Sequence, residues 1–234
     1  MEHTSNTTRV ALIFGGDGYV GSAVAQAFEQ SGWISVRAGR HTHNDDTHVA
    51  SDIEDSVSVM LAFNTVMQKY GRVDACIHTA SPTLERVPFI ASSTDSFRAH
   101  VHTAVLGTTH IVNAALASST VKNIVVITSK ATDATATKMG AYPFAKKMQR
   151  ELCKTFADRL PDRIHIHAIA PGFLPGGLND DLPQSVRDTY ALQKDGSTAN
   201  AHTIARIIVD ICEHKPQYAS SGDIDGETNI VTPF

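Results

Sequence analysis

Short apolar runs alternate with amphipathic stretches along most of the 234-residue chain. The runs are rich in residues that favour strands. The stretches between them place apolar side chains three and four positions apart, as a helix with one buried face requires. Strands are expected at 9–14, 33–38, 47–52, 73–80, 123–128 and 163–170, with a last short strand within 222–232, and helices at 20–30, 55–70, 94–118, 141–158 and 199–213.

This alternation, with strongly apolar central strands, predicts the α/β class: a doubly wound parallel sheet of the Rossmann type, with helices on both faces. One domain over 1–234 is expected, after a short irregular N-terminus at 1–8. Two irregular stretches, 81–93 and 171–198, follow strand ends, where open α/β sheets bind ligands. The second contains a predicted substrate lid at about 173–198, in which Gly176 and Gly177 suit a hinge.

The composition is that of an ordinary globular protein, with 42% hydrophobic and 19% charged residues. A formal net charge of −4 argues against nucleic acid or an anionic membrane as the main partner, and no apolar run is long enough to cross a bilayer. Cys76, Cys153 and Cys212 lie far apart without a CxxC pair, so reduced thiols are expected. Together with the polar N-terminus, they predict a cytoplasmic protein.

Twelve histidines are many for this length, and three pairs have HxH spacing: His41/His43, His100/His102 and His165/His167. On a strand, two side chains at this spacing share a face and could reach one metal ion. No further histidine or carboxylate stands at a helical ligand spacing to complete a site. No metal site is predicted, and a scattering of surface and half-buried imidazoles is the preferred interpretation.

The stretch between the first strand and the first helix reads FGGDGYVG and holds Gly15, Gly18 and Gly21 in GxxGxxG spacing. Gly15 suits a tight turn, Gly18 lets the backbone approach a pyrophosphate, and Gly21 lets the helix pack on the strand. The helix N-terminus then presents free N–H groups and a positive dipole end to phosphates. A glycine-rich turn without a ligand is the alternative, but the position between strand and helix favours dinucleotide binding.

The stretch after the second strand, VRAGRHTH, bears on the choice between NADP and NAD. An NAD site usually offers a carboxylate to the ribose 2′-hydroxyl there, and no acid stands near this strand end. Arg37 falls inside the strand and Arg40 just past it, so Arg40 is the candidate to grip a 2′-phosphate, and NADP(H) is predicted over NAD(H). Solvated charges at a strand end are the alternative. After the third strand, Asp52 either accepts a hydrogen bond from adenine or caps the next helix, with Ile53 against the ring.

Ser129 closes the fifth strand, and Tyr142 and Lys146 follow one turn apart on the next helix. A free phenol has a pKa of about 10 and exchanges protons poorly at neutral pH, but a nearby ammonium favours the phenolate and lowers that pKa. Tyr142 could then give a proton to a carbonyl oxygen as hydride arrives, or take one from an alcohol, while Ser129 holds the oxygen. An ordinary surface Tyr/Lys pair is the alternative.

The helix that carries Tyr142 is predicted in more detail. Pro143 is tolerated only in a first turn, so the helix should begin close to Tyr142. An apolar stripe of Ala141, Ala145, Met148, Leu152 and Phe156 is expected to be buried, and an adjacent stripe of Tyr142, Lys146, Gln149 and Cys153 is expected to look along the sheet edge.

With these motifs in this order, the chain resembles the short-chain dehydrogenase/reductase family over nearly its whole length. The resemblance rests on the glycine loop, Asp52, HTAS at 78–81, Ser129, the YxxxK of Tyr142 and Lys146, and APG at 170–172. It implies an NAD(P)(H)-dependent oxidoreductase that transfers hydride to a carbonyl or from an alcohol, with Ser129, Tyr142 and Lys146 as catalytic residues. The implied cofactor contacts are Gly15, Asp17, Gly18, Tyr19, Val20, Gly21, Arg40, Asp52, Ile53, Thr79, Ala80, Ser81, Lys146, Pro171, Gly172 and Phe173.

The chain departs from the family pattern at several positions. The family asparagine that holds a relay water for the lysine is matched by Ala104; His100, His102, Thr103 or water alone could replace it. HTAS stands in place of NNAG, and GxxGxxG resembles the extended or atypical branch. Two alternative functions therefore stay open: a catalytically weak NAD(P)-binding sensor of the same fold, and an epimerase or dehydratase.

Apolar side chains in the two irregular stretches are expected to wall a substrate pocket for a small, moderately hydrophobic carbonyl or alcohol, although packing within the lid is an equal alternative. The candidates are Leu84, Phe89, Phe173, Leu174 and Leu178, with Val87, Ile90 and Leu182 near them. The family resemblance also implies a homodimer or homotetramer, paired through the helices at 94–118 and 141–158.

Overall fold

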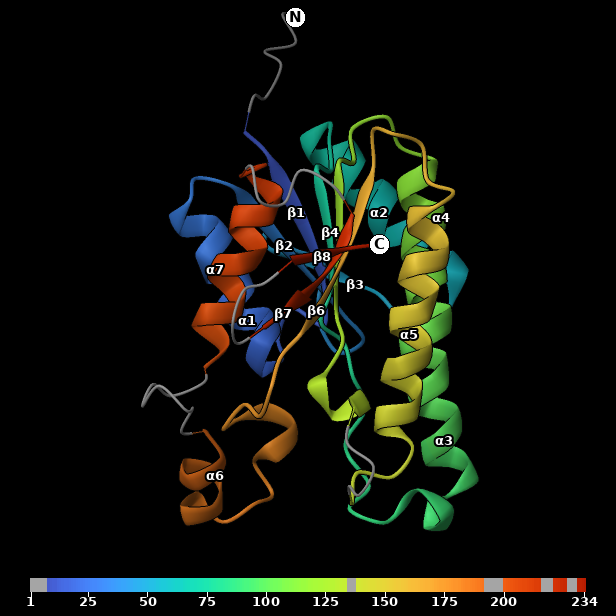
Figure 1. Cartoon of the computed structure of the whole chain (residues 1–234). Helices are drawn as coiled ribbons and strands as arrows, with labels where there is room; N and C mark the ends of the chain where they lie inside the picture. Colours follow the sequence, from blue (N-terminus) through green and yellow to red (C-terminus); the bar gives the residue numbers. More distant parts are fainter. Residues whose placement is uncertain (1–7, 134–137, 192–199, 216–220, 227–230) are drawn as a thin grey trace, which may run out of the picture.

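The computed structural model describes residues 8–133, 138–191, 200–215, 221–226 and 231–234. Within these residues, eight strands form one sheet in the order β3-β2-β1-β4-β5-β6-β7-β8 (Figure 1). Neighbouring strands run parallel from β3 to β7, and β8 is antiparallel to β7. The expected α/β sheet is confirmed, with an antiparallel edge strand that was not predicted.

The strands are β1 Val10–Phe14, β2 Ile34–Gly39, β3 His48–Ala50, β4 Ala75–His78, β5 Asn123–Ile127, β6 His165–Ala170, β7 Gly222–Asp225 and β8 Val231–Pro233. The α-helices are α1 Tyr19–Gln30, α2 Ser56–Tyr70, α3 Thr94–Val101, α4 Gly107–Leu116, α5 Tyr142–Ala157, α6 Gln184–Ala191 and α7 Ala201–Cys212. Short 3₁₀ helices are η1 Phe89–Ala91, η3 Lys130–Asp133 and η4 Gly177–Asn179, and the π-helical turn η2 His102–Leu106 connects α3 to α4.

Each predicted strand and helix is present, with ends shifted by a few residues. Three features differ from the prediction. The long helix expected over 94–118 contains the π-helical turn, and the last predicted strand is a pair, β7 and β8. The stretch 171–198, expected to be irregular, contains η4 and α6. α6 is short and mostly polar, so its sequence lacks the apolar spacing that reveals a helix.

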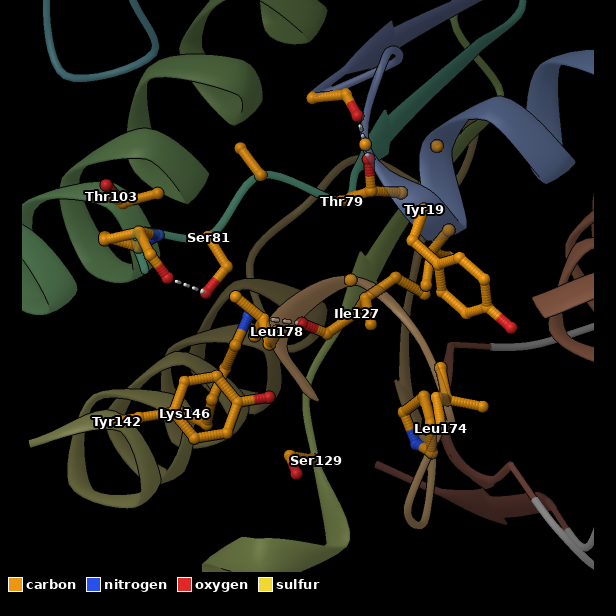
Figure 2. Close-up of a pocket in the computed structure, with 18 of the residues that line it drawn as sticks. Tyr19, Thr79, Ser81, Thr103, Ile127, Ser129, Tyr142, Lys146, Leu174 and Leu178 are labelled. Carbon is orange, nitrogen blue, oxygen red and sulfur yellow. Dashed lines mark hydrogen bonds between the residues drawn. The ribbon is translucent and has the colours of Figure 1, made fainter. Parts of the chain in front are cut away.

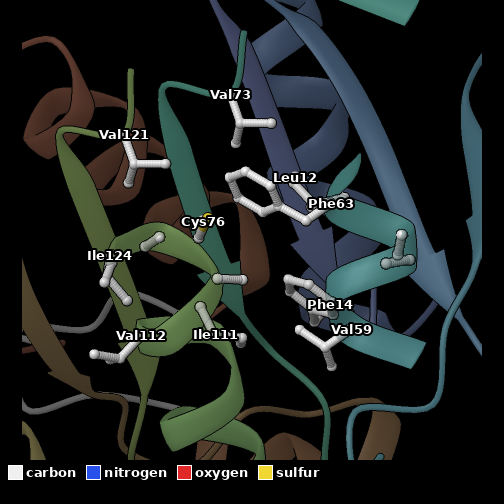
Figure 3. Packing of buried hydrophobic residues seen from close by; sticks show 14 of the residues in the cluster. Leu12, Phe14, Val59, Phe63, Val73, Cys76, Ile111, Val112, Val121 and Ile124 are labelled. Carbon is white, nitrogen blue, oxygen red and sulfur yellow. The ribbon is translucent and has the colours of Figure 1, made fainter. Parts of the chain in front are cut away.

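β1 shows why the central strands are apolar throughout. All five of its side chains are at most 1% exposed. Val10, Leu12 and Phe14 pack in the cluster with α2, α4 and α5, whereas Ala11 and Ile13 pack on the opposite face with α1 and α7 (Figures 1 and 3). A strand covered by helices on both faces buries both rows of side chains, so its sequence is a continuous apolar run.

Local signals place the helix boundaries near the site. The Asp55 carboxylate accepts a hydrogen bond from the N–H of Val57 and caps α2, which ends at Tyr70 and is followed by Gly71 with a φ of +76°. α5 begins at Tyr142 with Pro143 in its first turn, as the proline requires. The proline therefore places Tyr142 at the first turn of α5.

The buried face of α5 differs from the prediction. Its buried side chains are Tyr142, Ala145, Lys146, Gln149 and Cys153. Met148, expected in the core, is 36% exposed. The helix turns its polar stripe inward because hydrogen bonds inside the protein satisfy those side chains. Apolar spacing alone could not show this, since it does not reveal where polar atoms find partners.

Within the described residues, no helix is both long and apolar enough to span a membrane. Cys76, Cys153 and Cys212 are buried free thiols. Burial raises the pKa of Cys76 and of Cys153 to about 12, so both stay protonated and unreactive at neutral pH.

Candidate active site

A cavity of about 740 Å³ opens at the carboxyl ends of the parallel strands. It extends from the glycine loop, past the ends of β2, β3 and β4, to the ends of β5 and β6 and the start of α5 (Figure 2). The strand order changes direction between β1 and β4. This is the crevice in which open α/β sheets hold ligands.

The glycine loop has the geometry of a phosphate cradle. Gly15 has a φ of +80°, and a Cβ there would lie 2.6 Å from the backbone nitrogen of Ala80. A Cβ on Gly21 would lie 2.1 Å from the carbonyl oxygen of Gly15, so only glycine lets α1 approach the loop this closely. Gly18 caps α1 without a side-chain hydrogen bond, which leaves first-turn amides available to an anion.

The predicted cofactor contacts other than Asp17 line this one cavity: Gly15, Gly18, Tyr19, Val20, Gly21, Arg40, Asp52, Ile53, Thr79, Ala80, Ser81, Lys146, Pro171, Gly172 and Phe173. They follow one another from the ends of β2 and β3, across the glycine loop, to Lys146. A cavity that runs from these strand ends past a glycine-rich turn at a helix N-terminus to a buried lysine fits a dinucleotide.

Asp17 does not line the cavity, which differs from the expectation. Its carboxylate faces β2 and β3, 3.3 Å from Nε2 of His48 and 3.9 Å from Nη1 of Arg37. Arg37 also faces Glu29 at 3.9 Å, so acids surround it. Arg40 lines the cavity, is exposed, and has no ion-pair partner among the described residues. The structure thus separates the surroundings of Arg37, within β2, from those of Arg40, just after it.

The structure decides one of the two roles that the sequence left open for Asp52, the capping of α2. Asp55 is the residue that caps α2, so the capping interpretation of Asp52 is wrong. The Asp52 carboxylate accepts a hydrogen bond of 3.0 Å from the N–H of Glu54, and Asp52 lines the cavity beside Ile53. Its interaction with an adenine stays a prediction.

Ser129, Tyr142 and Lys146 meet at one end of the cavity (Figure 2). All three are at most 8% exposed. Nζ of Lys146 donates a hydrogen bond of 2.7 Å to the carbonyl oxygen of Ile127 and lies 5.8 Å from the centre of the Tyr142 ring. The Ser129 hydroxyl accepts a hydrogen bond of 3.1 Å from the N–H of Ala131, and its side chain lies close enough to Tyr142 to lower the pKa of the phenol. A serine hydroxyl, a phenol and an ammonium therefore lie together at one end of the cavity, largely buried from solvent.

Burial is the main electrostatic influence on this group. It raises the pKa of Tyr142, and the hydrogen bond with Ser129 lowers that pKa by less. It lowers the pKa of Lys146 to about 8, because the ammonium is removed from water. The expected net lowering of the Tyr142 pKa is therefore wrong: burial of a phenolate outweighs the neighbouring groups. At neutral pH, Tyr142 is a protonated phenol.

Most of the predicted substrate contacts line the cavity: Leu84, Phe173, Leu174 and Leu178. Phe89 does not. It is 52% exposed and packs against Phe97 and Phe144 on the outer side of α3 and α5. The sequence could not separate Phe89 from the others, since all are apolar residues in irregular stretches after strands.

Two segments that wall the cavity are tied together by Arg86, which the sequence analysis did not single out. Its guanidinium donates to the Asp181 carboxylate from Nε at 2.9 Å and from Nη2 at 2.7 Å. Nη2 also donates to the carbonyl oxygen of Leu178 at 2.8 Å and to Oδ1 of Asn179 at 3.0 Å. The guanidinium keeps the pKa of Asp181 below its usual value. These bonds join the segment after β4 to η4 and the residues that follow it.

Tyr19 explains the glycine pair in the lid. A Cβ on Gly176 would lie 2.5 Å from Cε2 of the Tyr19 ring, and a Cβ on Gly177 would lie 2.8 Å from Cβ of Tyr19. The two glycines therefore let the lid cross directly over the glycine loop. A hinge at this pair stays a prediction, and residues 192–199 of the predicted lid lie outside the described residues.

The cavity also includes residues that were not predicted to line it. Glu54 and Thr103 line it and share a hydrogen bond of 2.6 Å between their side chains. Lys130 lines it and forms an ion pair of 2.9 Å with Asp225. Of these three residues, only Lys130 could have been predicted from the sequence to line the cavity, because it directly follows Ser129 at a strand end. Glu54 and Thr103 meet through the tertiary fold.

Ala104, which stands in place of the family asparagine, is buried in the π-helical turn η2. Of the three side chains that could replace it, His100 is buried with its ring edge-on to Tyr142, at 5.8 Å between ring centres. His102 and Thr103 face Glu54 instead. No group of three histidine, cysteine or acidic side chains in the described part of the chain is placed to hold a metal ion.

Comparison with known proteins agrees with this fold and cavity. The family model for short chain dehydrogenases matches residues 9–186. The chain therefore belongs to the short-chain dehydrogenase family of oxidoreductases, as the motifs indicated.

Two relatives illustrate how distant the known members are. The putative ketoacyl reductase 2 of the granaticin polyketide synthase from Streptomyces violaceoruber is 24% identical over 80% of this chain and 84% of its own length. The 3-oxoacyl-acyl-carrier-protein reductase FabG of Thermotoga maritima is 22% identical over 95% of this chain and 98% of its own.

Solved structures share the fold over nearly the whole chain. A 3-ketoacyl-(acyl-carrier-protein) reductase from Brucella melitensis, complexed with NADH, superposes with a TM-score of 0.77 at 21% identity, covering 95% of this chain and 98% of the other. ElxO with NADP bound superposes with a TM-score of 0.80 at 20% identity, covering 94% and 98%. At this identity, the likeness shows the fold and no more.

Proposed function

We propose that this chain is an NAD(P)(H)-dependent oxidoreductase that interconverts a carbonyl and an alcohol on a small, moderately hydrophobic molecule. The observation that carries the proposal is that Ser129, Tyr142 and Lys146 line the same cavity as the glycine loop. A proton donor and a phosphate cradle in one crevice are what hydride transfer to a carbonyl oxygen requires. When bound, the nicotinamide cofactor supplies or accepts the hydride.

The three catalytic side chains have separate roles in this proposal. Tyr142 holds its proton at neutral pH, since burial raises its pKa, and gives it to the carbonyl oxygen. Ser129 orients the same oxygen by a hydrogen bond. Lys146 contacts the ribose hydroxyls next to the nicotinamide, and its positive charge stabilises the phenolate that remains. The protonated phenol is the form that carbonyl reduction requires, and the phenolate is the form that alcohol oxidation requires.

NADP(H) is the preferred cofactor in this proposal. Arg40 lines the cavity at the end of β2 without an acidic partner in the described chain, whereas Arg37 faces Asp17 and Glu29. A guanidinium matches the geometry of a ribose 2′-phosphate. The solved neighbours bind NADH in one case and NADP in another, so they do not decide the choice.

The substrate end of the cavity supports a ketone with apolar substituents. Leu84, Leu174 and Leu178 wall it, and both relatives described above are named as ketoacyl reductases. We therefore propose that 3-oxoacyl compounds belong in any substrate search, beside simple ketones and aldehydes.

A homodimer or homotetramer in the cytoplasm completes the proposal. Phe97 of α3 and Phe144 and Met148 of α5 are each at least 36% exposed and lie on the outer side of the helices expected to pair. The three free thiols fit a reducing compartment. Light scattering of the purified protein tests the assembly, and a monomer would contradict it.

The function is tested by mixing the purified protein with NADPH or NADH and a panel of ketones, aldehydes and 3-oxoacyl thioesters, and following the absorbance of the reduced nicotinamide. We expect consumption of NADPH with at least one apolar ketone, and weaker use of NADH. Tight cofactor binding by calorimetry without turnover across the panel would support a sensor instead, and an epimerase or dehydratase would convert its substrate without net oxidation of the cofactor.

A further inference from the structure

Gln149 is a polar side chain in the interior of the protein that the cavity does not reach. It lies on α5 one turn after Lys146, is 0% exposed, and is absent from the cavity walls. A buried amide is costly unless its donors and its acceptor are bonded. Its partners therefore indicate what it does.

The amide of Gln149 is fully bonded. Nζ of Lys146 donates to Oε1 of Gln149 at 3.0 Å. Nε2 of Gln149 donates to Nδ1 of His78 at 2.8 Å and to the hydroxyl of Thr108 at 3.1 Å. Thr108 in turn donates to the carbonyl oxygen of Ala104 at 2.6 Å. All four side chains are at most 4% exposed, so these bonds form away from competing water.

The direction of these hydrogen bonds follows from the donors and acceptors. Two acceptors take both protons of Nε2, so Oε1 must face the ammonium; the flipped amide would set N–H groups against it. Nδ1 of His78 accepts a bond, so the proton of this imidazole is on Nε2. Burial first, and the charge of Lys146 second, lower the pKa of His78 to about 3, so His78 is neutral.

His78, at the end of this series of hydrogen bonds, is held by a close contact with α4. A Cβ on Gly107, the first residue of α4, would lie 3.2 Å from Nε2 of His78 and 2.9 Å from Cγ1 of Ile53. The carbonyl of Thr103, in the π-helical turn, lies near enough to His78 to raise its pKa slightly. His78 is therefore confined between α4 and Gln149, and the chain of bonds connects β4, α4 and α5.

We propose that Gln149, fixed by His78 and Thr108, is a positioning residue for Lys146. Of the three ammonium protons, one goes to Gln149 and one to the carbonyl of Ile127, which leaves one for the cavity. The inference rests on the proposed function, because it assigns the third proton to the ribose of the bound cofactor. Both partners are neutral, so they orient the lysine without adding a negative charge beside it.

The test compares wild type with Gln149→Met, Gln149→Glu, Thr108→Val and the core variant Ile111→Val, which alters a buried side chain of α4 outside the chain of bonds. Three measurements are made on each: NADPH affinity by calorimetry, kcat/KM against pH, and ¹⁵N NMR of the Lys146 ammonium and the His78 ring without cofactor. In wild type, we expect His78 to be neutral and protonated on Nε2.

Gln149→Met should lower kcat/KM by about 10²-fold, since a small displacement of a catalytic group has an effect of this size. It should also weaken NADPH binding and shift both NMR signals. Thr108→Val should give a smaller loss in the same direction. Gln149→Glu returns an acceptor to Lys146 and should recover most of the activity, with the basic limb of the pH profile at higher pH because a carboxylate favours the ammonium. Ile111→Val should match wild type.

The proposal is overturned if Gln149→Met keeps the kinetics, the pH profile and the Lys146 signal of wild type, or if Ile111→Val loses as much activity. If Gln149→Met does not fold, Thr108→Val and Gln149→Glu decide the matter by the same criteria. If wild type reduces no carbonyl with either cofactor, the proposed function fails. The NMR measurements then still test the hydrogen bonds of Gln149 with Lys146 and His78. Unchanged Lys146 and His78 signals in Gln149→Met would refute these hydrogen bonds.

Discussion

Tyr142 and Lys146 lie one helical turn apart, with the lysine ammonium 5.8 Å from the centre of the phenol ring and both side chains buried. A charge that appears on the phenol oxygen is stabilised by the ammonium more strongly here than it would be in water. In the proposed function, the two residues act as a unit in which the phenol oxygen transfers the proton and the lysine supports it.

Tyr142→Phe tests this unit by removing one oxygen atom. We expect turnover to fall by about 10²–10⁴-fold, the usual effect of losing a general acid, while NADPH binding stays nearly the same. Steady-state rates and calorimetry measure the two effects. Tyr70→Phe, at the end of α2, is the matched control and should behave as wild type. Turnover that survives in Tyr142→Phe would remove Tyr142 from its role.

Arg40→Gln tests the cofactor preference. We expect the Kd for NADPH to rise by about tenfold or more, and the Kd for NADH to change little, because only NADPH carries the phosphate that the guanidinium would bind. Arg37→Gln is the matched comparison. Since Arg37 faces Asp17 and Glu29, its loss should affect both cofactors alike. Tighter binding of NADH than of NADPH by wild type would contradict the assignment of Arg40.

Arg86→Ala tests the bonds that close the substrate side of the cavity. The ion pair with Asp181 is partly exposed, so we expect a loss of about 1 kcal/mol, seen as a several-fold higher KM with kcat little changed. Hydrogen exchange of residues 174–182 should become faster. The double variant Arg86→Asp with Asp181→Arg should recover part of the KM. An unchanged KM and unchanged exchange would show that this ion pair does not hold the lid.

His167→Leu tests the response of stability to acid. His167 is 0% exposed, neither ring nitrogen has a hydrogen-bond partner in the described chain, and burial with nearby His165 and His214 lowers its pKa to about 3. The unfolded chain binds a proton at this histidine below about pH 6.5 and the folded protein does not, so stability is full above that pH and falls as the pH drops towards 3.

This histidine alone should remove about 2 kcal/mol of unfolding free energy between about pH 7 and about pH 5. In His167→Leu, the fall in unfolding free energy between the two pH values should be smaller by this amount. Urea unfolding at both pH values measures it. His202→Gln, at an exposed position on α7, is the control and should keep the wild-type difference. An equal pH dependence in His167→Leu and wild type would mean that His167 is protonated in the folded protein.

The fold could be predicted because its signals are local. The five buried residues of β1 read as an apolar run, and Pro143 requires α5 to start beside Tyr142. The missed elements lack such signals: α6 is short and polar, and the π-helical turn η2 does not interrupt the sequence pattern of the helix around it.

The candidate site could be predicted in part. Motif spacing brought Ser129, Tyr142 and Lys146 to one cavity. It did not show that the Asp17 carboxylate faces Arg37 and His48, because a sequence does not show which way a side chain turns. The sign of the Tyr142 pKa shift was also wrong, since it depends on how completely the phenol is buried.

By itself, the sequence determined the order of strands and helices, the glycine-rich turn before α1 and the one-turn spacing of phenol and ammonium, since backbone geometry sets these over a few neighbouring residues. Only the tertiary structure decided that the polar stripe of α5 faces inward and that Gln149 meets His78, 71 residues away. It also joined Arg86 to Asp181 across 95 residues. Burial and hydrogen-bond partners depend on atoms that come together only when distant segments pack.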